Sequence, residues 1–179
     1  NIGITQRVDA MGPHKELRDA LDQRLISWVI ESGCNPIPIP NNLIDQKLYT
    51  SDQSFFNNWM QDLNIDALLL SGGNDIGEVA QRDLIENNLL LWAEENKKPV
   101  LGICRGMQVM GVYAGSELVK LDGHVGVRHK LEFKNSDGQI LTETVNSYHN
   151  YALRDCPDSF SVLAESKDGG IEAIRHNEL

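Results

Sequence analysis

The stretch Lys98-Pro99-Val100-Leu101-Gly102-Ile103 runs directly into Cys104-Arg105-Gly106, and this junction decides how the chain is expected to fold. The first six residues form an apolar run typical of a buried strand, and residues 105–114 have the pattern of a helix. Gly102-Ile103-Cys104-Arg105-Gly106 therefore has the form G-x-C-x-G at a sharp turn from strand to helix. Glycine at both ends permits a tight turn and leaves the central side chain uncrowded. The pattern predicts a nucleophile elbow with Cys104 at the carboxyl edge of a sheet.

The cysteine in this elbow is the candidate nucleophile. A helix N-terminus favours the thiolate over the thiol through its unpaired N–H groups and its dipole. A free cysteine is more often a buried structural residue, and this is our interpretation of Cys34 and Cys156. Three cysteines without a C-x-x-C pair exclude a disulfide framework or zinc ribbon and favour a cytoplasmic location.

Apolar strands alternate with helices on both sides of the elbow. We expect strands at 2–5, 36–40, 67–70 and 98–103, and helices at 15–32, 54–63, 82–96 and 105–114. Alternating prolines place the 36–40 strand at an edge. Further strands are expected at 131–133, 140–145, 160–164 and 171–174, with turns at Ser136-Asp137-Gly138 and Asp168-Gly169-Gly170. The pattern predicts one α/β domain over residues 1–179, a flavodoxin-like three-layer sandwich with a mostly parallel central sheet and a β-rich C-terminal part.

Composition excludes several classes of protein. With 16 Lys plus Arg against 26 Asp plus Glu, the formal charge is −10, which argues against nucleic acid as a partner. The sequence has no apolar run long enough to cross a bilayer and no signal peptide, so no membrane association is expected. It contains neither a P-loop nor G-x-G-x-x-G, and we expect no cofactor.

A second motif supports a reaction at the elbow. Gly72 and Gly73 follow the 67–70 strand, so their N–H groups are expected beside Cys104. One of these donors and the N–H of Arg105 would form an oxyanion hole. A Gly-Gly pair that only turns the loop is the alternative interpretation.

The combination of S-G-G-N-D (71–75) and L-G-I-C-R-G-M-Q (101–108) resembles the class I glutamine amidotransferase-like family, particularly its γ-glutamyl hydrolase branch. The similarity continues through V-N-S-Y-H (145–149) and D-G-G-I-E-A (168–173), and so spans nearly the whole chain. Within the branch, the closest resemblance is to γ-glutamyl-CDP-amidate hydrolases of capsule phosphoramidate synthesis.

The resemblance implies attack by cysteine on a γ-glutamyl amide carbonyl, a glutamyl thioester, and hydrolysis that releases glutamate. It places Gln108 against the glutamyl group of a small-molecule substrate, and it lines the same group with the backbone around Ser147, Tyr148 and His149. A polar residue on the helix surface is the alternative for Gln108, and an ordinary strand-end histidine is the alternative for His149.

The chain departs from the family at the catalytic base. The family takes its base and orienting carboxylate from an H-P-E triplet, and no H-P-E occurs here. We expect the 179 residues to stop short of the natural C-terminus. The alternative is that His176 and Glu178, which share one face of a strand by their spacing, replace the triplet.

Two further groups of polar residues have more than one interpretation. Arg82, Asp83 and Glu86 are expected to form a charged first helical turn, or otherwise to face the substrate, and the Arg105 side chain to contact an anionic substrate. The stretch from His124 to Lys130 is either an exposed polar loop or a contact for the phosphates of a nucleotide amidate. A metal site at its two histidines lacks a convincing set of further ligands.

The sequence thus predicts a cysteine-dependent γ-glutamyl amide hydrolase, with γ-glutamyl-CDP-amidate as the best candidate substrate. Two alternatives stay open. One is a glutaminase subunit that supplies ammonia to a synthetase partner, and the other is an inactive binding domain of the same fold. A homodimer is also compatible with the sequence.

Overall fold

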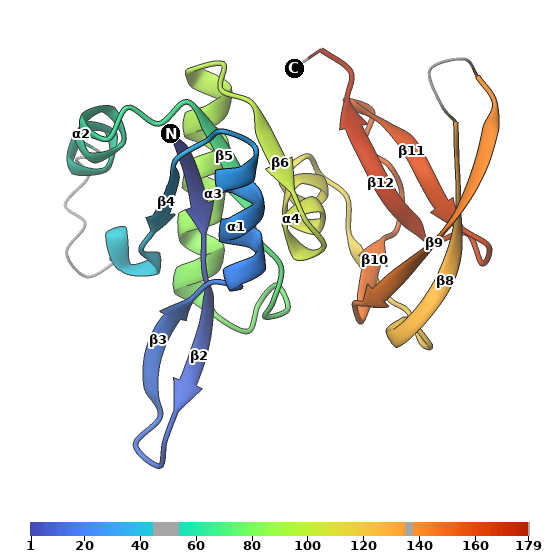
Figure 1. Ribbon diagram of the computed structural model, residues 1–179, viewed down its shortest axis with the longest axis horizontal. Coiled ribbons are helices and arrows are strands. Elements are labelled where there is room, and N and C mark those ends of the chain that lie inside the picture. Colours follow the sequence, from blue (N-terminus) through green and yellow to red (C-terminus); the bar gives the residue numbers. More distant parts are fainter. Residues whose placement is uncertain (45–53, 135–137, 179) are drawn as a thin grey trace. The chain divides into compact units, whose positions relative to one another are not determined.

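The computed structural model of the protein describes residues 1–44, 54–134 and 138–178 (Figure 1). Its contacts divide the chain into an N-terminal unit, Asn1–Gly106, and a C-terminal unit, Met107–Leu179. Among the described residues, each unit contains one four-stranded and one two-stranded sheet.

The N-terminal unit is built on a parallel four-stranded sheet. Its strands are β4 (Pro36–Ile39), β1 (Ile2–Thr5), β5 (Ala67–Leu70) and β6 (Val100–Gly102), in that order. The proline-containing strand β4 lies at an edge, as expected, because proline cannot donate to the ladder. The order matches the start of a flavodoxin-like sheet.

Helices cover both faces of this sheet. Helix α1 (Gln23–Glu31) lies on one face, and α2 (Ser54–Asp62) and α3 (Ala80–Glu95) lie on the other (Figure 1). Adjacent residues of β5 show the division: Leu68 packs in the core with residues of α2 and α3, and Leu69 packs with Ile4 and with Val29 of α1. The three-layer arrangement is therefore confirmed in this unit.

The expected helix at 15–32 is wrong in its first part. Residues Arg7–Met11 (β2) and Glu16–Ala20 (β3) instead form an antiparallel hairpin, and Leu17 is 64% exposed. The helix begins only after Asp22, whose carboxylate caps it by accepting the Arg24 N–H at 2.8 Å. Leu17 has the spacing of the apolar residues in α1, so the same helical period seemed to begin before Asp22. The residues before the cap do not form a helix and have no helix face to bury.

The strand that leads to the elbow is less buried than expected. Among the described residues, β6 is the last strand of its sheet, and Leu101 is 49% exposed. An apolar run alone does not distinguish a strand buried on both faces from one at an edge.

The C-terminal unit is antiparallel. Helix α4 (Arg105–Tyr113) begins at the elbow and continues into the C-terminal unit. One sheet has the order β12-β11-β8-β9, and a two-stranded sheet pairs β10 with β7. The strands are β7 (Leu118–Lys120), β8 (Val125–Lys134), β9 (Ile140–Tyr148), β10 (Tyr151–Leu153), β11 (Phe160–Ser166) and β12 (Ile171–His176).

The expected β-rich C-terminal part is confirmed, with additions. The turn at Asp168-Gly169-Gly170 joins β11 to β12, whereas Ser136 and Asp137 of the other expected turn lie outside the described residues. The three-residue strands β7 and β10 were not expected, and β8 begins six residues before the expected strand. Across the parts of the chain that the structure describes, no helix combines the length and apolar character needed to cross a membrane.

Candidate active site

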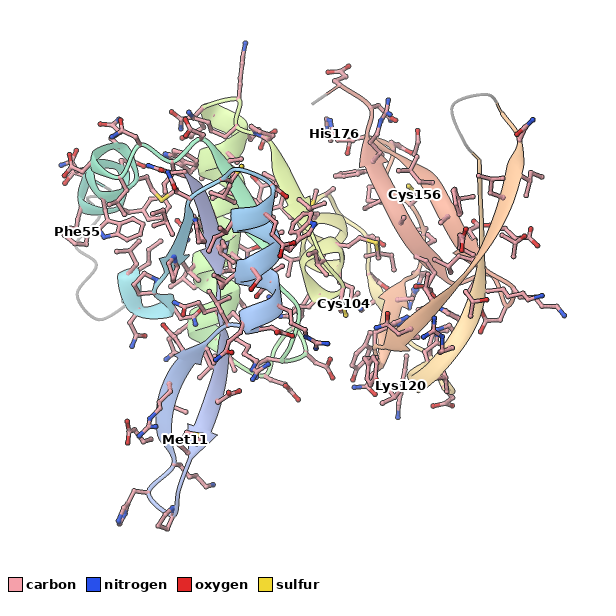
Figure 2. All side chains as sticks on the ribbon, in the orientation of Figure 1. Met11, Phe55, Cys104, Lys120, Cys156 and His176 are labelled. Atoms are coloured by element: carbon pink, nitrogen blue, oxygen red, sulfur yellow. The ribbon has the colours of Figure 1, made fainter. Side chains whose placement is uncertain are left out.

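Cys104 lies at the bend between β6 and α4 (Figure 2). Its backbone has φ of +54°, a left-handed conformation that non-glycine residues seldom adopt, and its side chain is exposed. The Gly106 N–H closes the bend by donating to the Ile103 carbonyl at 3.0 Å. A strained, exposed residue at a strand–helix turn is the geometry of a nucleophile elbow.

Gly106 is required by close packing of backbone on backbone. A Cβ at this position would lie 2.1 Å from the carbonyl oxygen of Leu70 in β5. The first turn of α4 therefore rests directly against the end of β5, and only glycine permits that approach.

The Gly72–Gly73 loop lies beside the elbow, as expected. A Cβ on Gly72 would be 3.7 Å from the Cβ of Cys104, and Gly73 has φ of +88°. The loop is anchored at its start, where the Ser71 N–H donates to the Thr5 hydroxyl at 3.0 Å. The role of this loop as an oxyanion hole stays a prediction.

A buried arginine holds the carbonyl groups of this loop. The guanidinium of Arg82, fully buried, donates to the carbonyl oxygens of Ser71 at 2.8 Å, Gly72 at 3.1 Å and Gly73 at 2.6 Å. In a trans peptide the N–H points opposite to the C=O of the same unit. Because the Gly72 carbonyl faces Arg82, the Gly73 N–H is directed away from the guanidinium.

The charge of Arg82 is balanced inside the same unit. Arg82 donates through Nε to Glu86 at 3.1 Å, Arg105 forms an ion pair with Glu86, and Arg105 also donates to Asp83 at 2.5 Å. Burial lowers the pKa of both arginines to about 10, which leaves each of them charged at neutral pH. We call Arg82, Asp83, Glu86 and Arg105 the arginine network.

This network corrects two expectations. Arg82 and Glu86 are fully buried, and so form neither a solvated first turn nor a substrate contact. The Arg105 side chain is 3% exposed and points to Asp83 and Glu86 rather than to an anionic substrate. The i,i+4 spacing of Arg82 and Glu86 indicates a pair on one helix face, but it does not say which face is buried.

In the C-terminal unit, two of the residues that the resemblance assigns to the glutamyl group meet at one carbonyl. Gln108 Nε2 donates to the Tyr151 carbonyl at 2.6 Å, and His149 Nδ1 lies 2.9 Å from the same oxygen. The Ser147 hydroxyl donates to the His124 carbonyl at 2.6 Å, whereas Tyr148 is 68% exposed. Gln108 is thus buried and bonded to this segment instead of lying on the helix surface.

The stretch from His124 to Lys130 is not a loop. Its residues after His124 belong to β8, and the side chains divide between the two faces of the strand. Arg128 and Lys130 are not buried, whereas His124 is 4% exposed and lies in a cluster of titratable groups. The two histidines are therefore not placed as surface contacts for phosphates.

That cluster contains residues that the sequence did not connect. Ligand atoms of His124, His149 and Glu172 lie within 4.8 Å of one another. The side-chain contact with Glu172 raises the pKa of His149, and bonds from Ser166 and His124 lower the pKa of Asp168. The sequence showed no further ligands for His124 and His129, but the fold brings His149 and Glu172 to them.

The alternative catalytic pair lies at the end of β12. Nδ1 of His176 accepts the backbone N–H of Glu178 at 3.2 Å, and the ring packs edge-on against Phe160. The catalytic role of His176 and Glu178 stays a prediction.

Comparison with known proteins identifies relatives along nearly the whole chain. Residues 16–179 match the glutamine amidotransferase class-I family. The γ-glutamyl-CDP-amidate hydrolase of Campylobacter jejuni is 32% identical over 184 residues, which cover 98% of this chain and 82% of that protein. The glutamine-hydrolyzing GMP synthase of Methanococcus maripaludis has a subunit that is 32% identical over 121 residues, which cover 65% of this chain and 60% of that protein.

The fold is also found among solved structures. A crystal structure from Thermoplasma acidophilum, of a candidate GMP synthase subunit, matches with a TM-score of 0.69 at 23% identity. The match covers 99% of this chain and 79% of that one. An α/β fold with a parallel sheet followed by an antiparallel part is thereby shown.

Proposed function

This chain belongs to the class I glutamine amidotransferase family, and on that premise we propose that it hydrolyses γ-glutamyl-CDP-amidate. The coarser activity is that of the family, hydrolysis of a γ-glutamyl amide bond. The observation that carries the proposal is Cys104, exposed at a left-handed bend beside the Gly72–Gly73 loop.

In the first half of the reaction, the Cys104 thiolate attacks the γ-carbonyl carbon of the glutamyl group. The carbonyl π electrons move onto oxygen, and the oxyanion is bound by the N–H groups of Gly73 and Arg105, with Gly72 shaping the loop. The direction of the Gly73 N–H, away from the Arg82 guanidinium, supports this role. Preorganised donors act strongly because they need no reorientation when charge develops.

Collapse of the tetrahedral intermediate breaks the C–N bond. The leaving nitrogen takes a proton from a general acid, and a glutamyl thioester remains on Cys104. The group that gave its proton to the leaving nitrogen now takes one from water, which attacks the thioester carbonyl. The same two N–H groups bind the second oxyanion, and the C–S bond breaks to release glutamate and the Cys104 thiolate. The arginine network holds the Gly72–Gly73 loop in place in both halves of the reaction and does not itself contact the substrate.

We assign the glutamyl group to Gln108 and to the segment Ser147, Tyr148 and His149, as the family resemblance implies. Support comes from the Tyr151 carbonyl, where the Gln108 amide and the His149 ring meet. The leaving group is assigned from the relative whose name specifies it, which aligns with 98% of this chain.

A second candidate function is favoured by the GMP synthase relative. That protein belongs to a glutamine-hydrolyzing synthase, so a glutaminase subunit that supplies ammonia to a synthetase partner is the alternative. In that case glutamine would be the best substrate, and a synthetase would raise the rate of its hydrolysis.

The test compares three substrates. We expect glutamate release from γ-glutamyl-CDP-amidate to exceed release from γ-glutamyl-GABA and from glutamine. Cys104→Ala should abolish turnover while leaving substrate binding largely intact, whereas the control Cys156→Ala should keep the wild-type rate. Turnover by the Cys104→Ala protein at the normal rate would overturn the proposed nucleophile, and a preference for glutamine would favour the synthetase alternative.

A further inference from the structure

Three side chains of the C-terminal unit bring two ring nitrogens and a carboxylate oxygen within 4.8 Å of one another. We call His124, His149 and Glu172 the histidine–glutamate cluster; His129 contacts Glu172 but is not part of the cluster. His124 Nδ1 lies 3.4 Å from His149 Nε2, and Glu172 Oε1 lies 3.5, 3.4 and 3.5 Å from His124 Nδ1, His149 Nε2 and His129 Nε2. We propose that this cluster binds one Zn²⁺ ion.

The spacing of the three cluster atoms is that of one face of a zinc coordination shell. Zinc binds imidazole nitrogen and carboxylate oxygen at about 2.0–2.2 Å, mostly in a tetrahedron. The edges of such a tetrahedron are about 3.3–3.5 Å long by simple geometry. The three separations among His124 Nδ1, His149 Nε2 and Glu172 Oε1, 3.4 to 3.5 Å, fit three of these edges without movement of a side chain.

The N–H groups of the His124 and His149 rings point away from the centre of the cluster. Nε2 of His124 lies 2.8 Å from the carboxylate of Asp168, and Nδ1 of His149 lies 2.9 Å from the Tyr151 carbonyl. Both partners accept, so each of these outer nitrogens carries the hydrogen. The inner nitrogen of each neutral ring is then a lone pair, and it faces another acceptor, the Glu172 carboxylate.

A centre of converging lone pairs needs a cation. A single proton can join two of these atoms, but Glu172 Oε1 and His129 Nε2 are buried without a hydrogen bond from any described residue. A metal ion satisfies the three cluster atoms at once. The geometry therefore points to a metal rather than to a shared proton.

The outer partners also match those of a metal site. Ligating histidines usually donate their second N–H to a carboxylate or a backbone carbonyl, which fixes the ring and its tautomer. His124 has Asp168 in this position, and Asp168 is itself held by the Ser166 hydroxyl at 2.5 Å. His149 has the Tyr151 carbonyl.

A β-bulge brings His124 and His129 to one face of the sheet. The two residues are five positions apart, an odd spacing that would place them on opposite faces of a regular strand. The pairing of β8 with β9 shifts by one residue between Val125 and Val127, and Gly126 has φ of +70°. This extra residue restores a common face for both rings.

The ion would join three strands that are distant in sequence. Its ligands come from the residue before β8, the residue after β9, and β12. With three protein ligands the tetrahedron keeps its fourth position for water, and the ion stabilises the C-terminal unit by joining these strands.

The test measures zinc binding by tag-free full-length protein after removal of metal with a chelator. We expect one Zn²⁺ per chain, a rise in Tm on zinc addition, and the visible spectrum of tetrahedral cobalt with Co²⁺ as probe. Glu172→Gln, nearly the same size, should weaken zinc binding by at least about 100-fold, and Asp168→Asn by about 10–100-fold. His14→Gln, at an exposed turn histidine, is the matched control and should bind zinc as the wild type does.

Two controls keep the result unambiguous. Cys104→Ala should still bind one Zn²⁺, which excludes the thiolate at the elbow as the zinc ligand. If Glu172→Gln fails to fold by circular dichroism, the graded loss in Asp168→Asn tests the proposal instead. The proposal would be overturned if the wild type takes up no zinc, or if the wild type, Glu172→Gln and Asp168→Asn all bind zinc with equal affinity.

Discussion

The arginine network and the histidine–glutamate cluster are both buried groups of charged or titratable side chains, but they are satisfied in different ways. In the first, donors alternate with acceptors: Arg82 and Arg105 bind two carboxylates and three backbone carbonyls. In the second, lone pairs of His124, His149 and Glu172 converge on one point. A buried polar group can thus pair donors with acceptors of its own chain, as the arginine network does although Arg105 Nε is buried without a hydrogen bond from a described residue, or it can be complementary to a cation from outside the chain.

The largest effect is expected from breaking the arginine network. Arg82→Gln leaves Glu86 with only the Arg105 ion pair and three loop carbonyls without a charged donor, and should lower the free energy of unfolding by about 3–5 kcal/mol. Chemical denaturation measures the loss. The loss in Arg82→Gln should be the same with zinc and with chelator, whereas a loss of stability in Glu172→Gln should depend on zinc. A zinc-dependent loss in Arg82→Gln would contradict the distinction between the arginine network and the histidine–glutamate cluster.

A smaller effect separates backbone packing from polar contacts at the elbow. Gly106→Ala places a Cβ against the Leu70 carbonyl, which cannot move away, and should cost about 1–3 kcal/mol of unfolding free energy. Gly111→Ala, in the same helix, is the matched control because the atoms nearest its Cβ belong to the Leu153 side chain, which can rotate, and not to the backbone. Denaturation midpoints that shift equally in the two variants would contradict this explanation.

The smallest effect is expected where an arginine pair is exposed. Arg24→Gln removes an ion pair with Asp22 in which the Arg24 side chain is 92% exposed. Water and salt screen such a pair, so the denaturation midpoint should not change measurably. A shift approaching that of Arg82→Gln would show that burial is not what distinguishes the two arginines.

Much of the N-terminal unit could be predicted because its signals are local. The strands at 2–5 and 67–70 and the helices around 54–62 and 80–95 follow from apolar runs and helical spacing. The helix at 15–32 was partly wrong because a period cannot show where a cap lies. The elbow was identified because G-x-C-x-G depends on a turn formed by neighbouring residues.

The two buried polar groups could not be predicted in the same way. Whether Arg82 faces solvent or core depends on what packs against α3, and this is decided by distant residues. The histidine–glutamate cluster depends on a register shift at Gly126 and on the return of β12, so neither spacing nor composition reveals it. Long-range pairing therefore set the limit of what the sequence could predict.

The left-handed bend at Cys104 also restricts which nucleophiles this backbone can carry. A β-branched side chain is poorly compatible with positive φ, so threonine would disturb the turn. Serine keeps the shape of cysteine and exchanges one atom, sulfur for oxygen. Among the two small hydroxyl side chains, the conformation of this single residue therefore favours serine over threonine as a replacement nucleophile.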